Sequence, residues 1–256
     1  TDLEDFPGEC CPDLRELKLR KNEQLRWEWY RMPLPKLEKL EVDMLGGHIL
    51  DIGHLGNLRE MTLWGSLIFQ GNKISRYVVE GVSRLQQLKK LELSHVSLGD
   101  TLELDGMTCL ETLSLLQVDC KRLILNKDID TLEYFRAIAC KFSDVEFLRH
   151  FSNVEHLRLE LCTLPESLDL RPCRKLKELD LFASSVKTIR NLPAEIRTLN
   201  LHGTKITQIP DGVRQMKQLE HLNLCYLRLR ELPEWLAELQ LRRKYRDRRR
   251  NGLWRN

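Results

Sequence analysis

The side chains with the widest chemical range in this chain are its eight cysteines and seven histidines. Thiolates and imidazoles are the usual ligands of structural zinc, and a cysteine beside a histidine can act as a nucleophile. Cys10 and Cys11 are adjacent, and His48 and His54 each follow a glycine, but the residues around them do not have the spacing of a metal site. We therefore expect the cysteine pair to cap an apolar core and the two histidines to lie in a loop.

The sequence contains none of four common catalytic motifs. These are a phosphate-binding Gly-x-x-x-x-Gly-Lys, a dinucleotide-binding Gly-x-Gly-x-x-Gly, a Gly-x-Ser-x-Gly nucleophile turn and a His-Glu-x-x-His metalloprotease helix. We therefore expect a protein that is not an enzyme and that has no cofactor, no metal and no small-molecule substrate.

The cysteines also indicate a cellular compartment. They do not gather at one end of the chain as in the caps of secreted repeat proteins, and the chain has no Asn-x-Ser/Thr glycosylation site. Cys140 and Cys162 are 22 residues apart and could form a disulfide or remain buried thiols, of which we favour the thiols. These features favour a reducing compartment, so we expect a cytoplasmic protein.

No targeting segment is visible in the sequence. There is no run of about 18 apolar residues that could span a membrane, and no signal peptide. The chain begins with Thr1 rather than Met, which we interpret as an excised fragment or a processed product with an effector or signalling domain before it.

A hexad of the form Leu-x-x-Leu-x-Leu recurs along the chain, for example at residues 219–224. Its first apolar places are 20 to 23 residues apart, except for one interval of 30 residues after the third hexad. The first, fourth and sixth places of the ten hexads are Leu14/Leu17/Leu19, Leu37/Leu40/Val42, Leu58/Met61/Leu63, Leu88/Leu91/Leu93, Leu110/Leu113/Leu115, Leu132/Phe135/Ala137, Val154/Leu157/Leu159, Leu176/Leu179/Leu181, Ile196/Leu199/Leu201 and Leu219/Leu222/Leu224.

The alternation within each hexad predicts a strand. Apolar residues at the fourth and sixth places and mostly polar residues at the third and fifth places have the period of two that is typical of a strand with one buried face. No unit can bury its apolar residues by itself, so neighbouring units must stack and align their strands in one parallel sheet.

On these hexads the chain resembles the leucine-rich-repeat family over roughly nine tenths of its length. The resemblance implies an α/β solenoid of about ten repeats, with a curved parallel sheet on the concave side and loops, short 3-10 turns and a few helices on the convex side. Three places after the sixth residue the family often has Asn or Cys. Here the position is occupied irregularly, by Val118, Cys140, Cys162, Ser184 and Thr204 among others.

Three segments depart from the repeat. In the long third unit, residues 69–72 are expected to form a loop and residues 76–87 a convex helix with Ser75 as its N-cap. The expected division is a solenoid over residues 1–241 and a basic tail over residues 242–256. Within the solenoid, residues 1–13 form a cap or partial repeat, residues 14–232 the ten repeats, and residues 233–241 the start of a capping helix in which Trp235 and Leu236 close the core.

The net charge of +3 has a local origin, because the last fifteen residues hold eight basic residues and one acidic residue. The rest of the chain is therefore negative, at −4. A solvated terminal cap explains this tail, and a weak phosphate-rich partner is the alternative. The residues concerned are Arg242, Arg243, Lys244, Arg246, Arg248, Arg249 and Arg250.

The polar strand places predict a binding surface on the concave side. Aromatic residues and arginine dominate binding energies at protein interfaces. Arg136 and Arg158 occupy the same place in adjacent units and are expected to form a basic pair. Apolar residues just after the strands could face a partner or fold back over the strand ends. The predicted partner-binding residues are Trp64, Tyr134, Arg136, His156, Arg158, Phe182 and Tyr226.

The last two units, with Ile-Pro and Leu-Pro after their strands, resemble cytosolic plant and bacterial leucine-rich-repeat proteins. The sequence therefore predicts a non-catalytic module that binds a protein on its concave face, as the sensor domain of an intracellular, immune-receptor-like protein. The alternative is the substrate-recognition arm of a bacterial effector ubiquitin ligase whose catalytic domain lies outside this chain.

Overall fold

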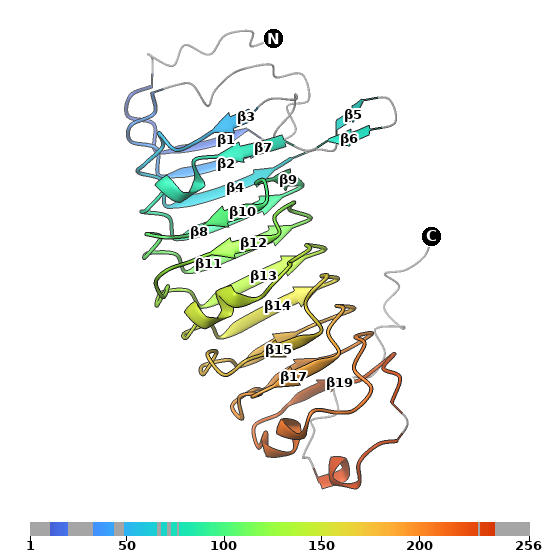
Figure 1. Ribbon diagram of the computed structural model, residues 1–256. Coiled ribbons are helices and arrows are strands. Elements are labelled where there is room, and N and C mark those ends of the chain that lie inside the picture. Colours follow the sequence, from blue (N-terminus) through green and yellow to red (C-terminus); the bar gives the residue numbers. More distant parts are fainter. Residues whose placement is uncertain are drawn as a thin grey trace.

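The repeated hexads form a single ten-stranded parallel sheet (Figure 1). The computed structural model describes residues 11–19, 33–43, 49–65, 68–70, 73–75, 77–229 and 231–238. Every strand pairs only with strands of the adjacent units, as the repeat predicts. The strands are β1 (Glu16–Leu19), β2 (Lys39–Asp43), β4 (Glu60–Trp64), β8 (Lys90–Ser94), β11 (Thr112–Leu116), β13 (Tyr134–Ile138), β14 (His156–Glu160), β16 (Glu178–Asp180), β18 (Thr198–Asn200) and β19 (His221–Asn223).

The register of this sheet aligns equivalent hexad places in rows. For example, Leu113 is paired with Phe135 and Leu115 with Ala137. Fourth and sixth places are buried, whereas third, fifth and seventh places are partly exposed, so that a typical strand alternates strictly along its length. The period of two predicted from the sequence is therefore confirmed, and the structure is a leucine-rich-repeat solenoid.

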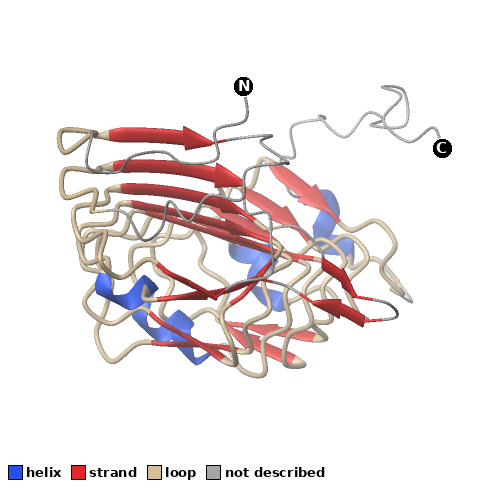
Figure 2. Cartoon of the chain, turned by 90° about the horizontal axis from the view of Figure 1, so that it is seen from above, coloured by secondary structure: helices blue, strands red, loops and turns tan. Residues whose placement is uncertain are grey.

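The opposite side of the solenoid is built from short strands and 3-10 helices, and the core lies between the two layers (Figure 2). All of these short strands except the β5–β6 pair are parallel. They are β3 (Ile49–Asp51), β7 (Tyr77–Glu80) and β9 (Val96–Ser97) in one sheet, β10 (Thr101–Glu103) with β12 (Arg122–Ile124), and β15 (Ser167–Asp169) with β17 (Thr188–Arg190). The 3-10 helices are η3 (Val82–Arg84), η4 (Glu146–His150), η5 (Asp211–Gln215) and η6 (Glu234–Glu238).

The predicted helix over residues 76–87 is wrong. Within this segment the structure has strand β7 and then only the single turn of η3. The β-branched Val78 and Val79 favour a strand, which pairs with β3 and β9. Gly81 then has a φ of 79°, a left-handed conformation that ends regular structure.

The predicted loop over residues 69–72 is also only partly right. Strands β5 (Ile68–Gln70) and β6 (Lys73–Ser75) form an antiparallel pair, so the long third unit contains a β-hairpin. The extra residues of this unit are thereby placed outside the stacked rows. The repeat continues in register after the insertion, because β4 pairs with β8.

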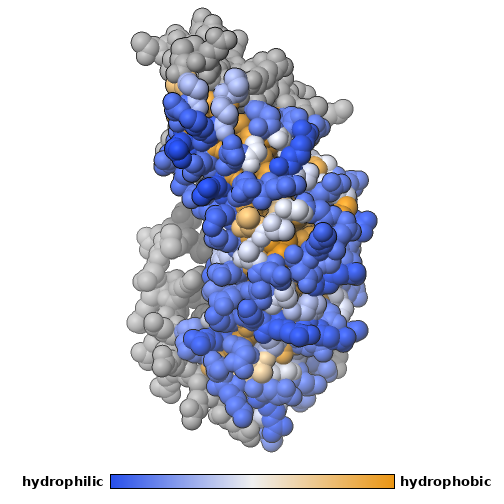
Figure 3. Space-filling view, turned by 90° about the vertical axis from the view of Figure 1, so that its left-hand side faces the viewer, coloured by the Kyte–Doolittle hydropathy of each residue, from blue (hydrophilic) through white to orange (hydrophobic). Residues whose placement is uncertain are grey.

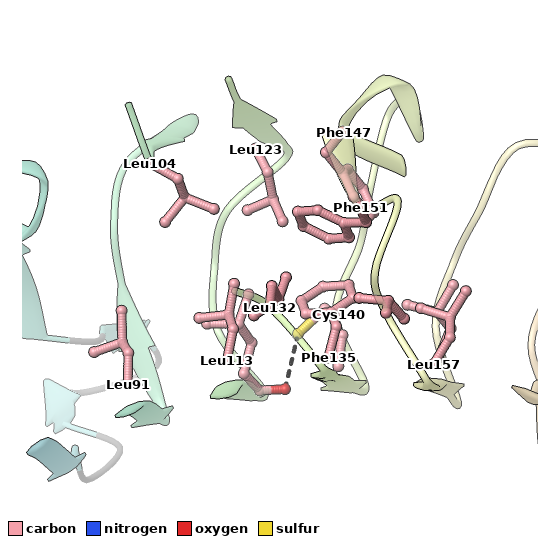
Figure 4. Packing of buried hydrophobic residues seen from close by; sticks show 14 of the residues in the cluster. Leu91, Leu104, Leu113, Leu123, Leu132, Phe135, Cys140, Phe147, Phe151 and Leu157 are labelled. Carbon is pink, nitrogen blue, oxygen red and sulfur yellow. Dashed lines mark hydrogen bonds between the residues drawn. The ribbon is translucent and has the colours of Figure 1, made fainter. Parts of the chain in front are cut away.

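The sixth unit fills its core with aromatic side chains. Phe135 and Ala137, which replace two leucines of the hexad, are both fully buried. The Phe135 ring lies 5.3 Å from that of Phe151 and 5.5 Å from that of Phe147, edge to face, an arrangement favoured by aromatic pairs (Figure 4). The large residue thus takes the volume that the alanine leaves.

The place three residues after the hexad carries a short ladder of thiols. Cys140 Sγ donates to the carbonyl of Leu115 at 3.5 Å, and Cys162 Sγ donates to the carbonyl of Ala137 at 3.4 Å (Figure 4). Each thiol thereby ties its unit to the preceding one. Both cysteines are free, so these residues are buried thiols rather than a disulfide.

Ser184 occupies the next position of this ladder and breaks it. The serine is 2% exposed, and its hydroxyl makes no hydrogen bond to any described residue. A buried polar atom without a partner costs roughly 1–3 kcal/mol. The irregular ladder predicted from the sequence is thus present.

Both flanking features of the chain agree with a solenoid cap. Trp235 and Leu236 on η6 are partly buried and pack against the core. The flank on the left of Figure 1 is mostly hydrophilic, with small apolar areas (Figure 3). Cys10, His48, residues 1–10 and the basic residues of the tail, Arg242, Arg243, Lys244, Arg246, Arg248, Arg249 and Arg250, lie outside the described residues.

We predict that Ser184→Cys stabilises the protein. A thiol in this position can reach the carbonyl of Leu159, as Cys140 and Cys162 do one and two units earlier, which should raise the free energy of unfolding by about 1 kcal/mol. Urea denaturation measures this change. Cys162→Ser is the matched reverse substitution, and it should create a second buried hydroxyl without a partner and lower stability. A stability of Ser184→Cys below that of the wild type would contradict the ladder.

We also predict that stability falls in alkaline solution. Burial raises the pKa of Cys120 from about 9 to about 11 and that of Cys173 to about 12, whereas the unfolded chain releases these protons near pH 9. The contribution of each thiol is therefore complete below pH 9 and is lost as the pH rises through the folded pKa.

The variant Cys173→Ala isolates this effect. Between pH 9 and 11, its free energy of unfolding should depend on pH less steeply than that of the wild type, by about 1.4 kcal/mol per pH unit. Cys225→Ala, which removes an exposed thiol, should leave the slope unchanged. Equal slopes for the wild type and Cys173→Ala would show that burial does not hold the proton.

Candidate functional site: the exposed wall of the sheet

The third, fifth and seventh hexad places form three parallel rows on the outer face of the sheet. The register of the strands sets these rows, since Thr112, Tyr134, His156, Glu178, Thr198 and His221 are successive pairing partners. None of these six side chains is in the core, and all are partly exposed. We call this face the wall.

The wall changes character at the eighth unit because the strands shorten from five residues to three. The Asp180 Oδ1 atom accepts the backbone N–H of Phe182 at 2.9 Å, and Asn200 and Asn223 accept the N–H groups of His202 and Cys225 in the same way. Such Asx turns take the backbone donor that a longer strand would use. The five-residue strands carry no Asp or Asn at the fifth place.

Carboxylates of neighbouring units surround the two predicted arginines. Arg136 and Arg158 are paired side by side in the register, as predicted. The Arg136 Nε atom lies 3.3 Å from Glu160 Oε1, however, and Arg158 Nη2 lies 2.5 Å from Glu178 Oε1. The expected basic pair is therefore neutralised by its surroundings.

Glu178 links the centre of the wall. Its second carboxylate oxygen lies 3.0 Å from His156 Nδ1, so that one carboxylate holds both His156 and Arg158. Burial opposes the charge of Arg158, but Glu178, Tyr134, Asp180 and Glu160 outweigh it and raise the arginine's pKa above its ordinary value. This guanidinium is therefore fixed in place by ion pairs.

The wall as a whole is acidic. Its described third, fifth and seventh places hold eight acidic and five basic side chains. The acidic ones are Glu16, Glu41, Asp43, Glu60, Glu92, Glu160, Glu178 and Asp180, and the basic ones are Lys18, Lys39, Lys90, Arg136 and Arg158.

Aromatic rings follow one another at the C-terminal end of the wall. Phe182 stacks on His202 with ring centroids 4.7 Å apart, and His202 lies 4.8 Å from Tyr226. The Tyr134 ring lies 6.0 Å from that of His156 in the middle of the wall. Tyr226 is 72% exposed.

The structure divides the predicted partner-binding residues into groups. Tyr134, Arg136, His156 and Arg158 form one cluster, and Phe182 and Tyr226 belong to the aromatic row in the following units. Trp64 is three strands away from Tyr134, roughly 14 Å at ordinary strand spacing. It is therefore separate from the other six.

Sequence reasoning missed His202 and Glu160, although both occupy the seventh place, one residue after the hexad. Applying the period of two to one more residue would have placed both on the wall. Leu161 was missed as well, and it is one of the few exposed large apolar side chains, at 52%.

Within the described ranges, no group of three His, Cys, Asp or Glu residues is placed to hold a metal ion. In the same part of the chain, no helix is both long enough and apolar enough to cross a membrane. The chemistry that the wall offers is ion pairing, stacking and apolar contact.

No protein-family model matches the chain. Among curated proteins, the disease resistance protein RML1A of Arabidopsis thaliana is 27% identical over 237 residues, which is 86% of this chain. The disease resistance protein RPS4B of the same plant is 34% identical over 106 residues, or 41% of the chain. The volume-regulated anion channel subunit LRRC8D of Rattus norvegicus is 27% identical over 194 residues, or 73% of the chain. The chain spans only 9% to 20% of the length of these curated relatives.

Solved structures share the fold. A leucine-rich-repeat protein of Leptospira interrogans has a TM-score of 0.64 and 21% identity, covering 91% of this chain and 60% of that chain. The functional domain of InlJ from Listeria monocytogenes, described as including a cysteine ladder, has a TM-score of 0.59 and 17% identity, covering 86% of this chain and 55% of that chain. The internalin InlF of the same bacterium has a TM-score of 0.53 and 21% identity, with coverages of 78% and 57%. These similarities show the leucine-rich-repeat fold.

We predict that Asp180→Ala destabilises the C-terminal part of the wall. The substitution removes the acceptor for the Phe182 N–H and for the Asn200 side chain, both at 2.9 Å, so the free energy of unfolding should fall by about 1–2 kcal/mol. Asp180→Asn retains an acceptor oxygen and should cost less than about half of this. Thermal and urea denaturation compare the two variants, and equal losses would show that the Asx turn is not the cause.

Proposed function

We propose that this leucine-rich-repeat solenoid is a non-catalytic recognition module that binds a protein on its wall. The observation that carries the proposal is the composition of the wall in units six to eight. There, Tyr134, Arg136, Arg158 and Phe182 lie on one partly exposed face, outside the core that holds the solenoid together.

The arrangement of these side chains suits recognition. Arginines held by Glu160 and Glu178 lose little conformational freedom when a partner binds, because their side chains are already fixed. Tyr134 and Phe182 offer large contact areas with few rotatable bonds. A partner would therefore meet a preorganised surface.

We further propose that the chain is the ligand-binding, sensor part of an immune-receptor-like protein that acts inside the cell. The two Arabidopsis relatives are disease resistance proteins, which supports a role in immunity. The neighbouring free thiols Cys140 and Cys162 support a reducing compartment.

The test compares wall and convex variants of the same protein. Proteins captured from lysate by the wild-type solenoid are identified and then titrated against the double variant Tyr134→Ala/Arg136→Gln. Affinity should fall by about tenfold or more, as expected for hot-spot residues. Arg122→Gln, an exposed residue on convex strand β12, is the control and should bind as the wild type does. Equal affinities for the wild type and the wall variant would exclude the wall as the site.

A further inference from the structure

A row of left-handed residues runs along the rim of the wall, at the eighth hexad place. His95, Gln117, Ala139, Leu161, Ala183, Gly203 and Tyr226 all have φ between 50° and 65°. Their N–H groups from His95 to Gly203 each donate to the seventh-place carbonyl of the next unit, for example Leu161 to Phe182 at 2.7 Å and Ala183 to His202 at 2.7 Å. The rim is therefore continuous with the sheet.

Leu161 and Tyr226 are poorly suited to this row as far as folding is concerned. A left-handed conformation costs an ordinary L-residue roughly 1–2 kcal/mol, whereas glycine adopts it freely, as Gly203 does in the same row. Burial does not compensate, because Leu161 is 52% exposed and Tyr226 is 72% exposed. Large apolar side chains that fold stability does not require indicate an interface.

We propose that the rim from Leu161 to Tyr226 docks an extended segment of a partner protein that has apolar side chains at alternate positions and a net positive charge. This inference rests on the proposed function and specifies the partner's chemistry. We call these four rim residues, Leu161, Ala183, Gly203 and Tyr226, the rim strip.

The spacing of the rim strip matches an extended chain. Leu161 and Tyr226 are three units apart, or roughly 14 Å, and four residues of extended chain cover roughly 13 Å. Side chains at positions i and i+4 of such a segment point to the same face, so one can contact Leu161 and the other Tyr226. The side chain at i+2 then lies over Ala183 and Gly203, where small residues leave room.

The charge of the partner follows from the wall beside the strip. Eight acidic and five basic side chains occupy the wall, and Glu160, Glu178 and Asp180 belong to the units next to Leu161 and Ala183. Lys205 and Arg228 follow the strip by two residues, but including them leaves the balance negative. Electrostatic complementarity therefore favours a cationic segment over an anionic one.

The experiment uses three synthetic, end-blocked heptapeptides as probes. The first alternates lysine and leucine, starting and ending with lysine. The second replaces the lysines with glutamates, and the third has the first peptide's composition with its leucines contiguous. Fluorescence anisotropy measures the binding of each to the full chain. The first peptide should bind at least about tenfold more tightly than either of the others.

The decisive variant is Leu161→Gly/Tyr226→Gly. Glycine suits the left-handed backbone, so the variant should fold and should bind the first peptide about tenfold or more weakly. Gln117→Gly, in the same row outside the strip, is the matched control and should bind as the wild type does.

Equal binding of the first peptide by the wild type and the double variant would overturn the inference, and so would preference for the glutamate peptide or no binding of the first peptide. These results leave the wall-directed proposal standing, because it is tested separately with Tyr134→Ala/Arg136→Gln. Loss of binding in the rim variant with unchanged binding in that wall variant would place the site on the rim and not on the wall.

Discussion

The structure depends on the burial of apolar side chains that no single unit can cover. One unit presents its fourth- and sixth-place residues to the inside, and these are sealed only when units stack on both sides of it. Leu113, Leu115, Leu157 and Leu159 are all fully buried, although each unit contributes only one short strand to the main sheet. The backbone then pairs along the same axis, so apolar contact and hydrogen bonding reinforce one register. The alternate side chains remain outside and can vary without loss of the core.

Most of the fold could be predicted from the sequence because the signal repeats. Ten hexads gave ten strands in the expected order, and even the divergent pair Phe135 and Ala137 took the predicted places. The helix over residues 76–87 failed for a local reason. Val78, Val79, Val82 and Leu85 have helical spacing, but pairing with β3 and β9 and the left-handed Gly81 override it. A pattern of about ten residues cannot reveal a partner strand that lies in another unit.

The candidate site was less predictable than the fold. Sequence reasoning placed Arg136 and Arg158 side by side because the repeat fixes their row. It could not show that Glu160 and Glu178 neutralise them, because those contacts join residues 20 to 24 positions apart and depend on side-chain conformation. The left-handed row at the eighth place was equally hidden, since Leu161 and Tyr226 are residues that rarely adopt that conformation. These contacts are consequences of stacking rather than of local composition.

The continuous rim of backbone hydrogen bonds constrains how such a chain can change in length. Between residues 112 and 175 each coil has the same number of residues, so every row of the sheet, the thiol ladder and the rim meets its counterpart one coil later. Losing or duplicating one whole coil would rejoin matching edges, whereas a smaller change within a strand would misalign all rows at once. The hairpin β5–β6 shows the other tolerated route, in which additional residues loop out between two coils. Variation in size is therefore confined to whole coils or to excursions from the convex turns.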